Sequence, residues 1–282
     1  MEKFAIIYDF DYTLSTKNSF EFSLFPSYGI KSDYEFLSDI EAMRKECNFE
    51  MILSFLYGLV QMAKQHNRPI TKEILFKAGK DIEFYPGVIE YFDKINEIGR
   101  RNGFEIEHYL LSSGLTEIMQ GSKIASKFRK IFGSEFHYDE NGLVDWPLNS
   151  INYTNKTQFI YRINKGILNN TDDKKLNAFM PKKKRAIKYR NMIYIGDGLT
   201  DVPCMKTMIA RNGYAIAVFS EDSKNAKSLL DHRRCNAIAK ADYREGSQLF
   251  NLIKKRIENC VKKWYFSTFF EESTWHCPNK MQ

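Results

Sequence analysis

Residues that could do chemistry follow the first apolar run of the chain. Asp9 and Asp11 come directly after residues 4–8, a run that lacks charge and is typical of a buried strand. If the extended spacing continues past the run, the two carboxylates face the same point beyond the carboxyl end of the strand. Thr13 follows as a small hydroxyl residue. An Asp-x-Asp pair is also common where a strand simply runs out into a polar loop, so this pair alone decides nothing.

Two further polar clusters end predicted strands in the same way. Ser112 follows a predicted strand over 106–111, and Asp197 and Asp201 follow another over 192–195. In a mostly parallel sheet, ligands bind outside the carboxyl ends of the strands. We therefore expect all three clusters to meet at one edge of the sheet.

A concentration of carboxylates at that edge requires a cation. The carboxylates expected there are those of Asp9, Asp11, Asp197 and Asp201. Two unit charges ~4 Å apart repel by about 4 kcal/mol at an effective dielectric constant near 20. All-oxygen ligands without a nearby His or Cys favour Mg²⁺ over zinc. Gly196 and Gly198 would let the backbone approach closely beside these acids.

The second cluster is suited to an anion. At Ser112, Ser113 and Gly114 a predicted strand turns into a helix, so a hydroxyl and backbone amides can cradle a negatively charged group. Lys156 lies in the first turn of a predicted helix, where the helix dipole already favours anions. A carboxylate nucleophile, a second acid, Mg²⁺ and an anion cradle together indicate phosphoryl transfer through an aspartyl-phosphate.

The elements that position these residues alternate between strand and helix. Further strands are predicted over 215–219 and 237–239, with a hairpin that turns at Asn141-Gly142. Helices are predicted over 88–98, 115–131, 154–163, 200–211 and 246–264. This alternation predicts an α/β fold with a doubly wound, mostly parallel sheet. We expect the aromatic tail, 265–282, to pack on this core.

Residues 16–84 have a different character. Three helical patterns occur there without a strand between them. Ser32 has the capping-box spacing for the first, Asn48 can cap the second, and Thr71 can start the third. The turn residues Pro86-Gly87 then return the chain to the alternating pattern. The sequence therefore predicts a catalytic core formed by 1–15 and 85–282, with an inserted helical unit over 16–84.

Composition limits the class of protein and its partners. The 282 residues are 43% hydrophobic and 27% charged with a net charge of +7, as in ordinary soluble domains with a mild basic excess. That charge can attract an anionic small molecule, and we expect the basic run 182–185 to be a solvated loop rather than a nucleic-acid site.

No apolar run has the length of a signal peptide or a membrane span. Five scattered cysteines without a Cys-x-x-Cys indicate reduced thiols and the cytoplasm. Nothing indicates the oligomeric state.

Four motifs in this order resemble the haloacid dehalogenase-like hydrolase superfamily, and in particular its phosphoserine-phosphatase-like branch. The motifs are Asp9-Phe10-Asp11-Tyr12-Thr13, Leu110-Leu111-Ser112-Ser113-Gly114, Lys156, and Gly196-Asp197-Gly198-Leu199-Thr200-Asp201. The resemblance covers about 1–15 and 85–245. It implies a Rossmann-like core, a helical cap formed by 16–84, and a phosphomonoester hydrolase that depends on Mg²⁺ and acts on a small phosphorylated metabolite.

The resemblance also implies roles for single residues. Asp9 would be the nucleophile and Asp11 the general acid and base, while Ser112 and Lys156 would hold the phosphoryl group. Thr13, Ser113, Gly114 and Gly198 would complete the binding of the phosphoryl group. Asp197 would bind Mg²⁺ together with Asp9 and the main-chain carbonyl of Asp11, and Asp201 would support the metal.

The sequence leaves the substrate and some alternatives open. Phosphoserine phosphatases have an acidic residue nine positions after the nucleophile, where this chain has Asn18, and Glu21 is out of register. A dehalogenase of the same fold needs neither Asp11 nor Mg²⁺, so the presence of Asp11 and of the expected Mg²⁺ ligands disfavours it. A phosphomutase or phosphotransferase would keep all four motifs. A catalytically silent binding relative would usually lose an acid from the first motif, and both acids are present.

Overall fold

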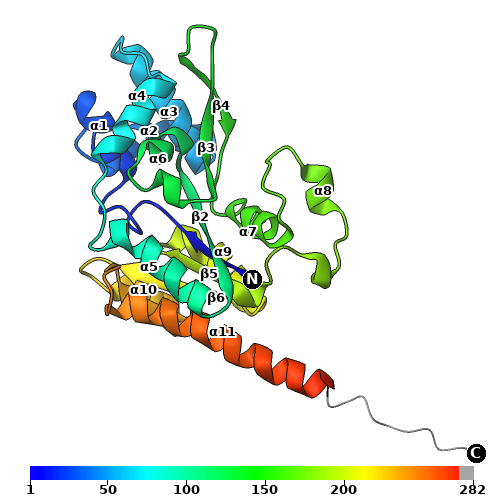
Figure 1. Cartoon of the computed structure of the whole chain (residues 1–282). Helices are drawn as coiled ribbons and strands as arrows, with labels where there is room; N and C mark the ends of the chain where they lie inside the picture. The colour runs from blue at the N-terminus through cyan, green and yellow to red at the C-terminus, as the bar shows by residue number, and fades with distance from the viewer. Residues whose placement is uncertain (273–282) are drawn as a thin grey trace, which may run out of the picture.

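The fold is built on one seven-stranded sheet. The computed structural model describes residues 1–272, and their side chains as far as 260. The strands lie in the order β4-β3-β2-β1-β5-β6-β7 (Figure 1). They are β1 (Glu2–Tyr8), β2 (Phe104–Leu115), β3 (Lys130–Tyr138), β4 (Val144–Asn149), β5 (Met192–Gly196), β6 (Tyr214–Phe219) and β7 (Ala237–Lys240). All neighbours are parallel except β3 and β4, which form the predicted antiparallel hairpin.

Strand β1 lies in the middle of the sheet and is buried on both faces. Phe4, Ile6 and Tyr8 belong to one buried cluster, and Ala5 and Ile7 belong to the other. Because successive side chains of a strand point to opposite faces, a strand covered on both sides needs a continuous apolar run. This is the physical reason for the uncharged run over residues 4–8.

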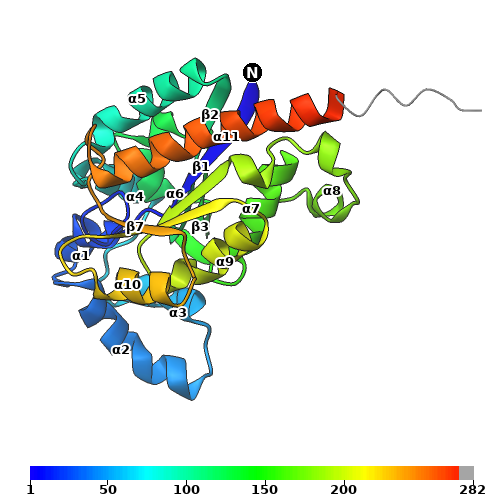
Figure 2. The same ribbon diagram turned by 90° about the horizontal axis from the view of Figure 1, so that it is seen from below.

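Helices cover both faces of the sheet, as predicted (Figure 2). On one face lie α5 (Val88–Arg101) and α11 (Gln248–Glu272), which bury residues such as Phe92 and Ile253. On the other lie α7 (Lys156–Lys165), α9 (Val202–Ala210) and α10 (Lys224–Asp231). The expected doubly wound α/β architecture is confirmed.

The inserted segment is helical, with α1 (Leu24–Ser27), α2 (Asp33–Glu46), α3 (Met51–Gln65) and α4 (Lys72–Ala78). Ser32 and Thr71 cap α2 and α4 as expected. The prediction that Asn48 caps the second helix is wrong. Glu50 accepts the hydrogen bond from the Leu53 amide at the start of α3, while Asn48 has a positive φ of 49° just after the end of α2.

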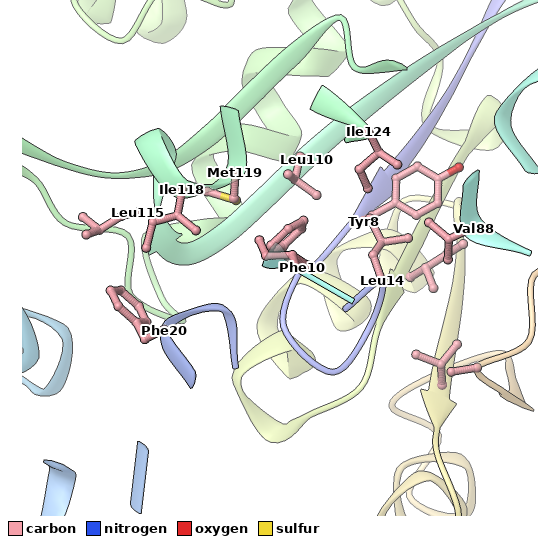
Figure 3. Packing of buried hydrophobic residues seen from close by; sticks show 14 of the residues in the cluster. Tyr8, Phe10, Leu14, Phe20, Val88, Leu110, Leu115, Ile118, Met119 and Ile124 are labelled. Atoms are coloured by element: carbon pink, nitrogen blue, oxygen red, sulfur yellow. The ribbon is translucent and has the colours of Figure 1, made fainter. Parts of the chain in front are cut away.

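Aromatic rings hold the insert together and join it to the sheet. Phe55 lies 5.0 Å from both Phe20 and Phe36, measured between ring centroids. Phe20 belongs to the same buried cluster as Leu115 and Ile118, and Figure 3 shows it lying toward these two residues beyond the end of β2. The insert therefore packs directly over the carboxyl edge of the sheet.

Two predicted helices differ from the observed ones. The helix expected over 115–131 is only α6 (Thr116–Gly121), followed by the 3-10 turn η3 (Ala125–Lys127). Residues from Lys130 onward instead pair with β2, so sheet formation overrides the local helical pattern. The last helix, α11, continues past the predicted end at 264 to Glu272.

The expectation that the aromatic tail packs on the core concerns side chains outside the described part. Among the described residues, no helix is both long and apolar enough to cross a membrane.

A buried histidine lies between the sheet and α5. The His108 ring is almost fully buried on β2, with Nε2 3.0 Å from Asn96 Oδ1 and Nδ1 2.9 Å from the Tyr8 hydroxyl. Both nitrogens of the neutral His108 ring therefore lie within hydrogen-bond distance of a polar partner. Burial lowers the pKa of His108 to about 3. The folded protein therefore keeps this ring uncharged over most of the acidic range.

We predict that His108 makes the protein sensitive to acid. An unfolded His titrates near its ordinary pKa, so its contribution to stability is complete above that value and is lost as the pH falls toward about 3. One group contributes a slope of at most about 1.4 kcal/mol per pH unit. His108→Gln should flatten the dependence of the unfolding free energy on pH, measured with urea. The exposed His137→Gln should not, and equal slopes in both variants would contradict the prediction.

Candidate active site

The polar clusters of three neighbouring strands meet at one edge of the sheet. Strand β1 lies between β2 and β5, and all three run in the same direction. Asp9 follows β1, Ser112 lies near the end of β2, and Asp197 follows β5. The Asp9 amide also donates to the Ile195 carbonyl at 2.8 Å, which ties the start of the loop to β5. Sequence reasoning therefore predicted the edge correctly.

The two acids of the first motif are not placed by the alternation of a strand. β1 ends at Tyr8, and the chain then folds around the Phe10 carbonyl, which accepts from the amides of Leu14 at 2.9 Å and Ser15 at 3.1 Å. Tyr12 has a positive φ of 57° within this turn. The expectation that the alternation of a strand directs Asp9 and Asp11 was wrong, because a tight turn sets the direction of each side chain.

Three carboxylates form a compact group. One oxygen of each of Asp9, Asp197 and Asp201 lies within 4.8 Å of the others. The Asp11 carboxylate is not part of this group. Instead, Asp11 Oδ1 accepts a hydrogen bond of 2.7 Å from the backbone amide of Ser19, at the start of the insert.

Lys156 is buried beside this carboxylate group. Its Nζ lies 3.0 Å from Asp9 Oδ1 and 2.7 Å from Asp201 Oδ1, and the side chain is only 1% exposed. The first turn of α7 places it there, as the sequence predicted. Lys156 thus compensates only part of the negative charge of three acids. The uncompensated charge favours the binding of a further cation.

Asp201 is held on several sides. Besides Lys156, its Oδ1 accepts a 2.6 Å hydrogen bond from the Tyr194 hydroxyl, and its Oδ2 accepts from the Gly198 amide at 3.3 Å. A Cβ atom on Gly196 would lie 2.3 Å from Asp201 Oδ2, so only glycine lets the backbone pass this carboxylate. Asp201 is completely buried and acts as an anchor for the group.

Thr13 connects the first motif to the last. Its hydroxyl donates to Asp197 Oδ1 over 3.4 Å, and its carbonyl accepts from the Tyr243 hydroxyl at 2.8 Å. Tyr243 itself is buried against α5. Hydrogen bonds of Thr13 to Asp197 and Tyr243 therefore hold the turn that carries Asp9 and Asp11.

The serine motif forms a tight loop at the end of β2. The Gly114 amide donates to Ser112 Oγ at 3.0 Å, and the Ser113 carbonyl accepts from Ser134 on β3 at 2.8 Å. Ser112 is 2% exposed. This hydrogen bond uses a lone pair of the Ser112 oxygen and leaves the O–H group able to donate to another acceptor.

The acids have raised pKa values because they are buried near one another. Burial and, next, the charge of Asp201 raise the pKa of Asp9 to about 6, although Lys156 opposes both effects. Burial and the charge of Asp9 raise the pKa of Asp11 to about 7. The pKa of Asp197 is raised well above its ordinary value, again by burial first. Burial alone would lower the pKa of Lys156, but the carboxylates of Asp201 and Asp9 raise it above its ordinary range.

Sequence reasoning missed three contributors to this site. Tyr194 lies inside a uniformly apolar strand and Tyr243 in a distant loop, so neither has a recognisable sequence signal. Ser19 follows Asn18, the position at which phosphoserine phosphatases have an acidic residue, and no pattern marks Ser19 itself. The Asn18 side chain accepts from the Phe20 amide and lies 3.3 Å from Asp33 Oδ2, so it caps a turn of the insert.

The sequence profile of the haloacid dehalogenase-like hydrolases matches residues 6–206. The chain therefore belongs to this family. An uncharacterized protein of Borreliella burgdorferi is 29% identical, over 90% of this chain and 96% of that protein.

Solved structures show the same fold. A phospho-aspartyl intermediate analogue of phosphoserine phosphatase is 17% identical, with a TM-score of 0.53 over 90% of this chain and 99% of that one. A hydrolase of this family from Salmonella enterica subsp. enterica serovar Typhi is 19% identical, with a TM-score of 0.54 over 83% of this chain and 66% of that one. At these identities the likeness concerns the fold, which is that of the phosphoserine-phosphatase-like branch.

We predict that Lys156 is required for stability as well as for the arrangement of the site. Lys156→Met leaves two buried carboxylates without their shared cation, and such a loss typically costs about 3–5 kcal/mol. Adding Asp201→Asn should recover part of the lost unfolding free energy, measured with urea. Lys206→Met on the exposed face of α9 is the matched control, and similar losses in both single variants would refute the prediction.

Proposed function

We propose that the protein is a phosphomonoester hydrolase that depends on Mg²⁺ and forms an aspartyl-phosphate on Asp9. The observation that carries the proposal is the buried group of Asp9, Asp197 and Asp201 with Lys156 beside it. Membership in a hydrolase family and the likeness to phosphoserine phosphatases support it. The cysteine pattern and the absence of a long apolar run are consistent with action in the cytoplasm.

Asp9 is the proposed nucleophile. Its Oδ1 is bonded to Lys156, which fixes the plane of the carboxylate and leaves the other oxygen to attack phosphorus. The bond from Asp9 to phosphorus forms while the bond to the leaving group breaks, and water later releases phosphate from the aspartyl ester. In the proposal, Lys156, Ser112 and the backbone of Ser113 and Gly114 hold the oxygens of the phosphoryl group, with Thr13 and Gly198 fixing the surrounding loops.

Asp11 is the proposed acid and base. Its pKa of about 7 keeps a substantial fraction protonated near neutral pH, as an acid for the first step requires. The proton goes to the oxygen of the leaving group. After the leaving group departs, the Asp11 carboxylate can take a proton from the attacking water.

The carboxylate group fits a hard divalent cation. Asp9 and Asp197 offer oxygen ligands, and the structure describes no His or Cys among the ligand atoms of this group. We assign Mg²⁺ to Asp9, Asp197 and the Asp11 carbonyl, with Asp201 as a support because its oxygens already accept hydrogen bonds from Lys156, Tyr194 and Gly198. When bound, the ion would neutralise charge on the phosphoryl group.

The insert over 16–84 is the proposed cap. It packs above the carboxyl edge of the sheet and touches Asp11 through Ser19. Such a lid excludes water and contacts the leaving group, so we assign the choice of a small phosphorylated metabolite to it.

Metal dependence tests the proposed function. Hydrolysis of para-nitrophenyl phosphate should stop with EDTA and return with Mg²⁺, whereas Ca²⁺ should support it poorly because it prefers longer and more numerous bonds. Asp9→Asn should be inactive with either metal. Full activity in the presence of chelator, or turnover by Asp9→Asn, would contradict the assignment.

A further inference from the structure

The two linkers that join the insert to the sheet are paired with each other. The Thr16 amide donates to the Glu83 carbonyl at 3.0 Å, and the Tyr85 amide donates to the Leu14 carbonyl at 3.0 Å. An antiparallel bridge lies between these two bonds. The chain therefore enters and leaves the insert through one short ladder, and a change in this ladder reaches both ends of the insert.

One residue of the core is bonded to both linkers. The Tyr243 hydroxyl donates to the Thr13 carbonyl at 2.8 Å, and the Tyr243 amide donates to the Pro86 carbonyl at 2.8 Å. The bridge of the ladder joins Ser15 to Phe84. Thr13 lies two residues before the first of these and Pro86 two residues after the second, so Tyr243 binds the same end of both linkers.

The core holds Tyr243 in place. Its side chain is completely buried, and its ring centroid lies 5.1 Å from that of Tyr91 on α5. In the same loop, Asp242 Oδ1 accepts from the Arg244 amide at 3.0 Å. A Cβ atom on Gly87 would lie 2.4 Å from the Arg244 nitrogen, and the φ of Gly87 is 82°, so only glycine lets the second linker approach this loop so closely.

The first linker begins in the turn that carries the proposed nucleophile. Thr13 lies in the turn around the Phe10 carbonyl, two residues after Asp11, and its hydroxyl donates to Asp197 Oδ1 over 3.4 Å. A shift of the Thr13 carbonyl therefore moves the backbone that directs Asp9 and Asp11. A misplacement of reacting groups by about 1 Å can lower a rate by about 10²-fold.

We propose that Tyr243 is a positioning residue, which fixes the turn carrying Asp9 relative to the second linker of the insert. The assignment rests on the proposed function. Tyr243 acts only through the carbonyls of Thr13 and Pro86, and it contacts neither the phosphoryl group nor the leaving group. Its role is to keep the direction of the nucleophile constant while the insert, held by the same two linkers, covers the site.

The contrast between kcat and KM separates this role from a structural one. Tyr243→Phe keeps the ring and the amide bond to Pro86, and it removes only the bond to Thr13. It should lower kcat for para-nitrophenyl phosphate by roughly 5- to 50-fold. KM should stay within about twofold, because the proposed phosphoryl ligands Ser112 and Lys156 lie on β2 and α7, outside this turn.

Tyr109→Phe serves as the control. Tyr109 is also buried, but it lies on β2 and its hydroxyl is bonded to the Glu107 carboxylate. This variant should leave both kcat and KM unchanged. Equal losses of kcat in the two variants, or a rise in KM without a loss of kcat in Tyr243→Phe, would overturn the role of Tyr243 while leaving the phosphatase intact.

Amide hydrogen exchange tests the same role without any substrate. In Tyr243→Phe the Thr16 and Tyr85 amides should exchange about 2- to 10-fold faster, measured by mass spectrometry on the peptides that contain them, while the amides of α5 keep their rates. Tyr109→Phe should exchange like the wild type at all these amides. If the wild-type protein hydrolyses no phosphomonoester, the proposed function fails by itself, and faster exchange at the linkers would still support the hold of Tyr243 on them. Unchanged exchange at the linkers of Tyr243→Phe would overturn the inference whatever the activity.

Discussion

The site depends on one buried ion pair network, in which Lys156 joins Asp9 to Asp201. Three carboxylates within 4.8 Å would repel one another strongly in a buried place. Lys156 offsets part of that repulsion and fixes one oxygen each of Asp9 and Asp201. Tyr194 and Gly198 then hold Asp201 from other sides, so the network connects α7, β5 and the loop after β1. Without it, the edge of the sheet would have acids but no fixed arrangement.

The remaining charge of this network supports the proposed binding of a metal ion. A single lysine cannot neutralise all three acids; burial and, next, the charge of Asp201 raise the pKa values of Asp9 and Asp197. A divalent cation would relieve the repulsion and lower both pKa values. The same imbalance would favour the proposed binding of a metal ion, and a bound metal ion would in turn favour an anionic substrate.

Much of this could be predicted from the sequence, because the strands are continuous apolar runs that end in acids or hydroxyls. The order of the elements, the common edge and the helical insert follow from such local patterns. What could not be predicted depends on contacts distant in sequence, such as Tyr243 with Thr13 or Tyr194 with Asp201. The end of the helix expected over 115–131 was misassigned because residues from Lys130 onward pair with β2, a contact distant in sequence.

The most direct test is to trap the covalent intermediate. Asp11→Asn keeps the nucleophile but loses the acid and the base, each worth about 10²–10⁴-fold in rate. With an activated aryl phosphate the first step should suffer less than the second, so a phosphoenzyme should accumulate. Mass spectrometry after acid quenching should find one added phosphoryl group on the peptide that contains Asp9. A phosphoryl group on a serine or histidine instead, or no adduct during turnover, would contradict the account.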